Sequence, residues 1–278
     1  MYLRRILIII IMFAISSCDR QEEMPIRKLT VGVVSYGGNE ASLQKYDEFK
    51  NYLGEQQNSL IELEPAYNEV RALQQIYNKK WDLVFAPPGL ATIAISQHNY
   101  EPLVSLEGRD KTRSILVTKS NSAIENMRDL SGQSIALGQK GSATGYYLPI
   151  YNLYGLNFKE VIYASTPKDV LQQIQDGKVT VGALSLAEYN LLKRQFPPNQ
   201  FKVVHLDKHE VPAGAVLISE RIERNQQEQI KKALKDAPSF ISANAGYLPT
   251  EEIPDYTQLT KTIERVREVL EESPMVLQ

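Results

Sequence analysis

Short apolar runs alternate with amphipathic stretches along the first third of the chain. Each run is rich in β-branched or aromatic residues, and each is followed by a segment whose apolar residues recur at helical spacing. Such runs predict buried strands, and the segments between them predict helices. We expect strands at 29–34, 60–63 and 81–86, and helices at 41–55, 69–79 and 90–97. This order is typical of a parallel sheet with right-handed crossovers.

The alternation restarts after two further predicted strands, at 103–106 and 114–118. The later elements are strands at 134–137, 161–164, 179–184, 201–206 and 213–219, and helices at 127–132, 167–175, 187–195, 227–234 and 256–270. The chain thus predicts an α/β fold of two lobes. Residues 28–117 and 214–278 form the first lobe and 118–213 the second. Ligands of such folds bind in the cleft at the carboxyl ends of the strands.

The first residues have the features of a targeting segment. Arg4 and Arg5 precede an apolar stretch, 6–15, that is short for a membrane span, and small residues then lead to Cys18. This pattern looks like a bacterial lipoprotein signal, which implies removal of residues 1–17 and lipid on Cys18. Residues 18–27 then form a polar tether. An uncleaved membrane anchor is the alternative, and either outcome places the rest of the chain outside the cytoplasm.

Composition narrows the class of protein. The chain has 278 residues, 43% of them apolar and 23% charged, which is globular composition. A net charge of −2 does not suggest nucleic acid as a partner. A single cysteine excludes an internal disulfide and any multi-cysteine metal site. We interpret His205 and His209 as surface residues, expect no metal and no cofactor, and find no catalytic constellation that indicates an enzyme.

The most informative stretch is 137–154, LGQKGSATGYYLPIYNLY. It predicts a strand end, a glycine-bearing turn and the start of a helix. A helix N-terminus presents free N–H groups and a partial positive charge, which favour anions. Pro149 is tolerated near a helix start, so we expect the helix to begin at 144–146 and the N–H groups of 145–147 to face the cleft. An ordinary capped helix is the simpler alternative.

Several phrases, in their order along the chain, resemble one family. After the lipoprotein-like signal come LTVGVV, PAYNEV, WDLVFAPPGLA and, most specifically, DLSGQSIALGQKGSATGYYLP. Most of residues 28–245 is similar to the phosphate/phosphite/phosphonate-binding subunits of bacterial ABC importers. The resemblance implies a type II periplasmic-binding fold, in which two α/β lobes are joined by two crossovers that act as a hinge.

The resemblance also implies a ligand site. The family's oxyanion-binding turn aligns with Ser142, Ala143, Thr144 and Gly145, and Tyr146 follows it. Ala143 stands where the family has a second hydroxyl, so the backbone donors are retained and one side-chain donor is missing.

The partner positions across the cleft depart from the family pattern. Tyr67 aligns with the family's tyrosine, but Ala66 replaces the aspartate before it. Gly89 begins the dipeptide that replaces a Ser-Tyr pair, no histidine occurs at 165–168, and Thr180 stands in place of an acidic residue. These departures leave the identity of the ligand open.

Other candidates come from residues near predicted strand ends. Tyr36 is a candidate ligand contact, although tyrosines also pack in cores. Arg113, with Arg109 before it, offers a cation for an anion, and a solvated loop is the alternative. Lys140 adjoins the turn, and Glu188 opens a helix that faces the expected cleft.

We therefore expect a monomeric, lipid-anchored solute-binding protein that captures a small oxyanion or organic anion and docks to an ABC permease. Lobe closure around the ligand would be the mechanism. Two alternatives remain: an extracytoplasmic sensor on the same fold, and an enzyme on that fold.

Overall fold

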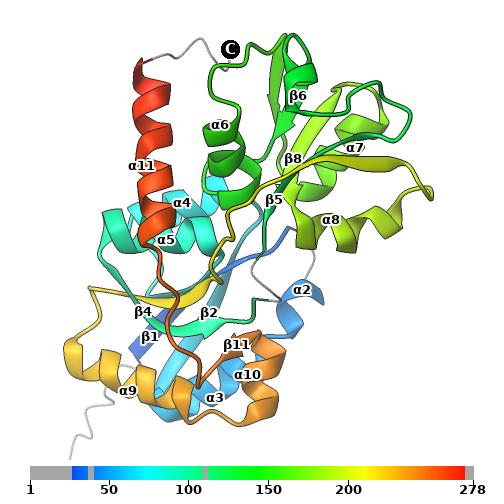
Figure 1. The fold of residues 1–278 in the computed structure, drawn as a ribbon. Helices are drawn as coiled ribbons and strands as arrows, with labels where there is room; N and C mark the ends of the chain where they lie inside the picture. The colour runs from blue at the N-terminus through cyan, green and yellow to red at the C-terminus, as the bar shows by residue number, and fades with distance from the viewer. Residues whose placement is uncertain (1–26, 37–40, 109–111, 273–278) are drawn as a thin grey trace, which may run out of the picture.

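The computed structural model describes residues 27–36, 41–108 and 112–272. Two separate sheets lie one above the other, and the chain passes between them twice (Figure 1). The arrangement confirms the predicted two-lobed α/β fold. Cys18, the rest of the tether up to residue 26, and Arg109 lie outside the described residues, whereas Arg27, predicted as the end of the tether, begins a strand.

The first lobe is built on a six-stranded sheet in the order β11-β4-β10-β3-β1-β2. Its strands are β1 (Arg27–Val34), β2 (Ser59–Ala66), β3 (Leu83–Ala86), β4 (Tyr100–Leu106), β10 (Ala215–Ser219) and β11 (Tyr247–Leu248). As the alternating pattern predicts, β2, β1 and β3 pair in parallel. The strand β10 returns from the second lobe and inserts antiparallel between β3 and β4.

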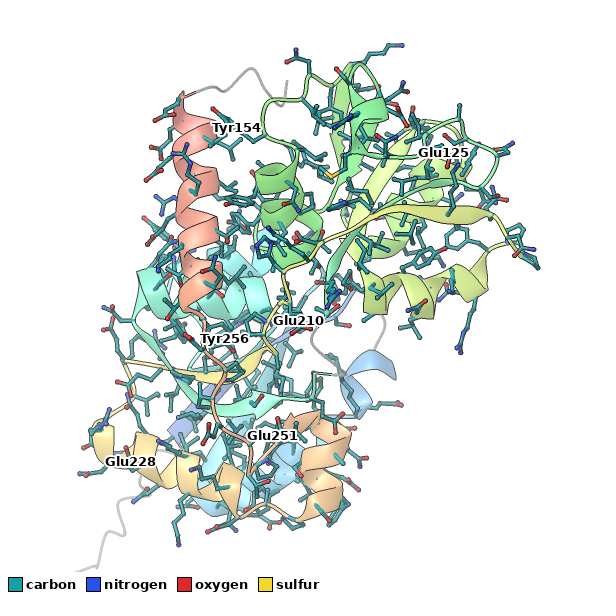
Figure 2. The ribbon with its side chains drawn as sticks, in the orientation of Figure 1. Glu125, Tyr154, Glu210, Glu228, Glu251 and Tyr256 are labelled. Atoms are coloured by element: carbon teal, nitrogen blue, oxygen red, sulfur yellow. The ribbon has the colours of Figure 1, made fainter. Side chains whose placement is uncertain are left out.

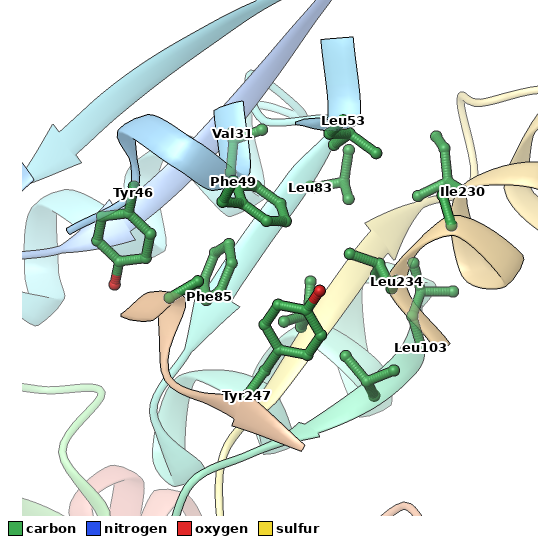
Figure 3. Close-up of a cluster of buried hydrophobic side chains, with 14 of the residues drawn as sticks. Val31, Tyr46, Phe49, Leu53, Leu83, Phe85, Leu103, Ile230, Leu234 and Tyr247 are labelled. Carbon is green, nitrogen blue, oxygen red and sulfur yellow. The ribbon is translucent and has the colours of Figure 1, made fainter. Parts of the chain in front are cut away.

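Helices cover both faces of this sheet. They are α2 (Ala41–Gln44), α3 (Asp47–Gln57), α4 (Glu69–Tyr77), α5 (Pro88–His98), α9 (Arg224–Lys235) and α10 (Ser239–Ala245). The single helix expected at 41–55 is divided at Tyr46, whose N–H donates to the carbonyl of Leu43. The side chains of α3, α9 and the sheet enclose an aromatic core in which Phe49, Phe85 and Tyr247 meet edge to face (Figure 3).

The second lobe is built on a five-stranded sheet in the order β7-β6-β8-β5-β9. Its strands are β5 (Ser114–Lys119), β6 (Ser134–Leu137), β7 (Glu160–Tyr163), β8 (Val181–Ser185) and β9 (Phe201–Leu206). Its helices are η1 (Met127–Leu130), η2 (Ala143–Tyr147), α6 (Leu148–Asn152), α7 (Pro167–Gln175), α8 (Leu186–Leu192) and η3 (Lys193–Gln195). Because β5 belongs to this sheet, the second lobe starts a few residues earlier than the expected residue 118.

Two segments, 107–113 and 207–214, connect the lobes. They run antiparallel at one point, where the N–H of Val211 donates to the carbonyl of Thr112 over 2.8 Å. A second hydrogen bond, from the N–H of Leu106 to the Gly214 carbonyl at 2.9 Å, joins the two segments where they meet the first lobe. Paired crossing strands of this kind form a hinge, and Glu210 lies on the returning strand (Figure 2).

The last helix, α11 (Thr257–Glu272), runs beside the second lobe although the sequence division assigns 214–278 to the first (Figure 1). Leu259, Ile263 and Val266 join the apolar cluster of the second lobe. Ile93 of α5 belongs to the same cluster, so α11 also contacts the first lobe. In the part of the chain that the structure describes, no helix has the length and apolarity needed to span a bilayer.

Candidate ligand-binding cleft

A cleft of about 470 Å³ lies between the two lobes at the hinge. Its walls come from both lobes and from both crossing segments: Tyr36, Glu69, Pro87, Pro88, Gly89, Glu107, Gly108, Thr112, Gly141, Ser142, Ala143, Thr144, Ser185, Ala187, Glu188, Val211, Pro212, Ala213, Gly214 and Glu251. No lysine or arginine occurs among these described lining residues. The described lining offers backbone donors, hydroxyls and carboxyl groups for hydrogen bonding.

The cleft lies where strands end and helices begin, as expected for this fold class. The helix α5 follows β3 through Pro87, α8 follows β8 through Ser185, and η2 follows β6 through the 138–142 turn. Pro88 and Gly89 form the first turn of α5. Since helix N-termini carry partial positive charge, three such termini at one cleft favour a ligand with negative charge.

The turn at 138–147 shows how its backbone donors are used. Ser142 is the N-cap of η2, and its Oγ accepts from the N–H of Gly145 at 3.0 Å. The N–H groups of Tyr146 and Tyr147 donate to the Ser142 carbonyl. The expectation that the N–H groups of 145–147 face the cleft is therefore wrong, because a π-helical turn consumes them.

The free donors lie one step earlier in the turn. Among the described residues, the N–H groups of Ala143 and Thr144 have no hydrogen-bond partner, and both residues line the cleft. The carbonyl of Thr144 accepts from Ser114 Oγ at 2.6 Å, which fixes this peptide against β5. The hydroxyl of Thr112, on the hinge, is also buried without a partner among the described residues. These groups form the donor side of the cleft.

An acidic group occupies the opposite side. Glu69, the first residue of α4, is only 5% exposed and accepts a 2.7 Å hydrogen bond from the Tyr36 hydroxyl. Burial raises the pKa of Glu69 to about 7, against the opposing effect of that hydrogen bond. Burial likewise raises the pKa of Tyr36 well above its usual value, with Glu69 adding to the effect.

Glu188 is the second carboxyl group of the cleft. It forms a capping box with Ser185, whose N–H and hydroxyl donate to Oε2 at 2.9 and 2.8 Å. Burial raises the pKa of Glu188, and its hydrogen bonds to Ser185 lower it. This carboxyl group is thus committed to the start of α8, whereas that of Glu69 accepts from the Tyr36 hydroxyl and from its own backbone N–H.

The lobes touch each other directly beside the cleft. A Cβ atom added to Gly89 would lie 2.1 Å from the carbonyl oxygen of Gly141 and 2.7 Å from the backbone nitrogen of Ala143. One added to Gly141, whose φ is +115°, would lie 2.8 Å from Cβ of Glu69. Two glycines therefore allow the backbone of the second lobe to lie against the first.

Ser142, Ala143, Thr144 and Tyr36 line the cleft, and the remaining predicted ligand contacts lie elsewhere. Gly145 is part of the turn's internal bonding. Tyr146 is 8% exposed and packs against Tyr147 and Tyr163 in the second-lobe core.

Two further candidates lie outside the lining. Tyr67 is 52% exposed, and Arg113 forms an ion pair with Glu210 at 3.2 Å. Lys140 lines a different groove, formed by α4, α5 and Arg267.

Thr180 lies at the start of β8, away from its cleft end, and donates to Gln133 Oε1 at 3.1 Å. Thr180, which aligns with the family's acidic residue, is therefore not among the described residues that line the cleft. At the cleft end of the same strand stand Ser185 and, three residues later, Glu188.

Glu69 and Gly89 were not recognised as site residues from the sequence. Glu69 directly follows the N-cap Asn68, where an acidic residue is ordinary, and only its burial distinguishes it. The dipeptide Pro88-Gly89 at a strand end was the available signal, since it permits close approach of another backbone. The described residues hold no cluster of metal-binding side chains.

A family model described as "ABC transporter, phosphonate, periplasmic substrate-binding protein" matches residues 31–242. The chain belongs to this family. The resemblance found in the sequence is confirmed, and the protein is a periplasmic substrate-binding protein of the ABC phosphonate-transporter family, whose members bind a small ligand and act with an ABC permease. A comparison with curated proteins gave no match.

Solved structures share the fold at low sequence identity. XAC2383 from Xanthomonas citri, bound to ATP, superposes with a TM-score of 0.72 at 17% identity, covering 87% of this chain and 99% of its own. A binding protein component of an ABC phosphonate transporter (PA3383) from Pseudomonas aeruginosa gives 0.65 at 13% identity, covering 90% and 98%. PhnD1 from Prochlorococcus marinus, in complex with methylphosphonate, gives 0.65 at 16% identity, covering 90% and 99%. At such identities the likeness concerns the fold, and the type II periplasmic-binding architecture is confirmed.

Proposed function

We propose that the protein is a lipid-anchored importer subunit that captures a phosphate- or phosphonate-like oxyanion in the interlobe cleft. The observation that carries this proposal is the pair of unused N–H donors at Ala143 and Thr144. They point to an anion because they stand at a helix start where two further helix N-termini meet. Thr144 is 7% exposed, and its hydroxyl adds a side-chain donor beside these two N–H groups.

The importer role rests on family membership and on closure of the two lobes. A ligand held by Thr144 on one lobe and by the first turn of α5 on the other contacts both halves. Such a ligand favours the closed form by its differential affinity for it. The closed form would then be the one that an ABC permease receives. Anchoring through Cys18 rests on the lipoprotein-like signal in the sequence.

The test is a titration with phosphate, phosphite and methylphosphonate, by calorimetry and by thermal shift. Thr144→Val keeps the shape of the side chain and removes its hydroxyl. A hydrogen bond to a charged group contributes about 1.5–3 kcal/mol, so the bound anion should dissociate roughly 10- to 150-fold more readily.

Thr262→Val is the matched control, since that threonine lies in α11 and its hydroxyl donates to the Gln258 carbonyl, outside this cleft. Equal affinities for wild type and Thr144→Val would remove Thr144 from the site. Failure of the wild-type protein to bind any of the three anions would refute the oxyanion assignment.

A further inference from the structure

The carboxyl group of Glu69 has no structural task that explains its burial. The N-cap of α4 is Asn68, whose side chain accepts from the N–H of Arg71 at 2.9 Å, so the helix start does not depend on Glu69. The side chain lines the cleft and is 5% exposed. Its Cβ abuts Gly141, directly before the turn that holds the free donors.

Among the residues that the structure describes, no cation lines the cleft beside Glu69 to balance a negative charge. Tyr36, after β1, donates its hydroxyl, and Glu188, on α8, adds a second negative group. Beside Glu69, the other side chains that lie against Gly141 are apolar: Leu90 of α5 and Leu73 of α4. The charged lining residues Glu107 and Glu251 are exposed glutamates at the rim. A fully ionised oxyanion placed between these groups and the 143–144 donors would face a bare carboxylate.

A single hydrogen removes this conflict. If it lies between a Glu69 oxygen and a ligand oxygen, the carboxyl group either donates to the anion or accepts from a protonated anion, so a charge-assisted hydrogen bond replaces a contact between two bare acceptor oxygens. The rise of the Glu69 pKa toward neutrality agrees with a group that gains or shares a hydrogen easily. At pH 8 and above, where Glu69 is mainly ionised, the hydrogen must come with the ligand.

We propose that Glu69 is a specificity-determining residue that admits oxyanions able to bring a hydrogen, such as hydrogen phosphonates, and rejects sulfonates and sulfate. The proposal rests on the proposed function, because it concerns a second contact to the same anion. Phosphonate oxygens hold or regain a hydrogen near neutral pH, whereas sulfonates are fully deprotonated. One hydrogen bond thus distinguishes two tetrahedral anions of similar size.

The probes are methylphosphonate and methanesulfonate, each titrated calorimetrically into the full mature protein at pH 5.5 and pH 8. At pH 8 the wild type should bind methylphosphonate at least tenfold more tightly than methanesulfonate. At pH 5.5, where Glu69 itself carries the hydrogen, that ratio should shrink. In Glu69→Gln the amide can donate to either anion, so the ratio at pH 8 should fall at least tenfold.

Two further variants keep the test decisive. Glu228→Gln, an exposed glutamate of α9 outside the cleft lining, should leave the ratio at pH 8 unchanged. Tyr36→Phe removes the hydrogen bond that lowers the pKa of Glu69, so methanesulfonate binding should persist to higher pH even if Glu69→Gln folds poorly.

Equal wild-type affinity for both anions at pH 8, or an unchanged ratio in Glu69→Gln, would overturn this inference and leave the oxyanion site intact. Absence of binding by either anion at both pH values would overturn the inference, and the proposed function would fall with it only if phosphate and phosphite also fail to bind.

Discussion

Substitution of Gly89 by alanine tests whether the observed contact between the lobes belongs to the ligand-bound form. The added methyl group would lie 2.1 Å from the Gly141 carbonyl oxygen and 2.7 Å from the Ala143 nitrogen, and both are backbone atoms. Backbone cannot turn aside as a flexible side chain does, so the lobes must move apart at this point. Overpacking of this kind costs about 1–3 kcal/mol, which corresponds to roughly 5- to 150-fold weaker binding of the anion.

The same substitution should not harm the lobes themselves. Gly89 lies in the first turn of α5 with an ordinary helical backbone, where alanine is favoured over glycine by up to about 1 kcal/mol. The unliganded Gly89→Ala protein should therefore unfold at or above the wild-type temperature while its affinity for methylphosphonate falls. Gly54→Ala, in α3, is the control, because its nearest neighbour is the Ser59 carbonyl oxygen at 3.1 Å, away from the cleft.

Calorimetric titration measures the affinity, and small-angle scattering with saturating ligand should show a larger radius of gyration for Gly89→Ala than for wild type. If Gly89→Ala binds as tightly as wild type and scatters identically, the Gly89–Gly141 contact is not part of the bound form, and the reasoning fails.

Two other outcomes follow from the site and the N-terminal segment. The native pKa of Glu69, about 7, exceeds the unfolded value of 4.5, so the folded state holds more hydrogen between these pH values and stability falls as pH rises through that window. This loss of stability amounts to roughly 3 kcal/mol, and Glu69→Gln should abolish it. Chemical denaturation of both proteins at pH 4.5 and pH 8 measures the difference. A parallel pH dependence of stability in both proteins would contradict the assignment of the raised pKa. Cys18→Ser should shift the protein from the membrane to the soluble fraction of cells that process lipoproteins, and retention in the membrane fraction would indicate an uncleaved anchor instead.

The sequence predicted the fold well because periodicity records burial. The central strand β3 is buried at every position and β1 in most of its second half, the edge strand β2 alternates at its start between buried and exposed residues, and β10 was visible as another apolar run. The short α10 and β11 were not predicted as separate elements, since Gly246 at φ +78° separates them over very few residues.

Of the residues that line the cleft, the first lobe contributed only Tyr36 to the prediction. The turn at 142–144 has its own sequence signal of glycines and hydroxyls, and it does line the cleft. Glu69 had no such signal, because its burial results from contact with Gly141 of the other lobe, more than seventy positions away in the printed sequence. Contacts between lobes depend on where the hinge places them, and single-sequence periodicity does not contain that information.

The placement of α11 has a consequence for how the molecule comes apart. Ile93 from the first lobe shares one apolar cluster with Leu259 and Ile263 of α11 and with the second-lobe core. The Tyr256 hydroxyl also donates to the carbonyl of Ala213 on the crossing segment at 2.9 Å. Melting one lobe would expose apolar surface of the other, so the two halves unfold as one cooperative unit. Partly melted forms, the ones that proteases outside the cytoplasm cut most readily, would therefore be scarce.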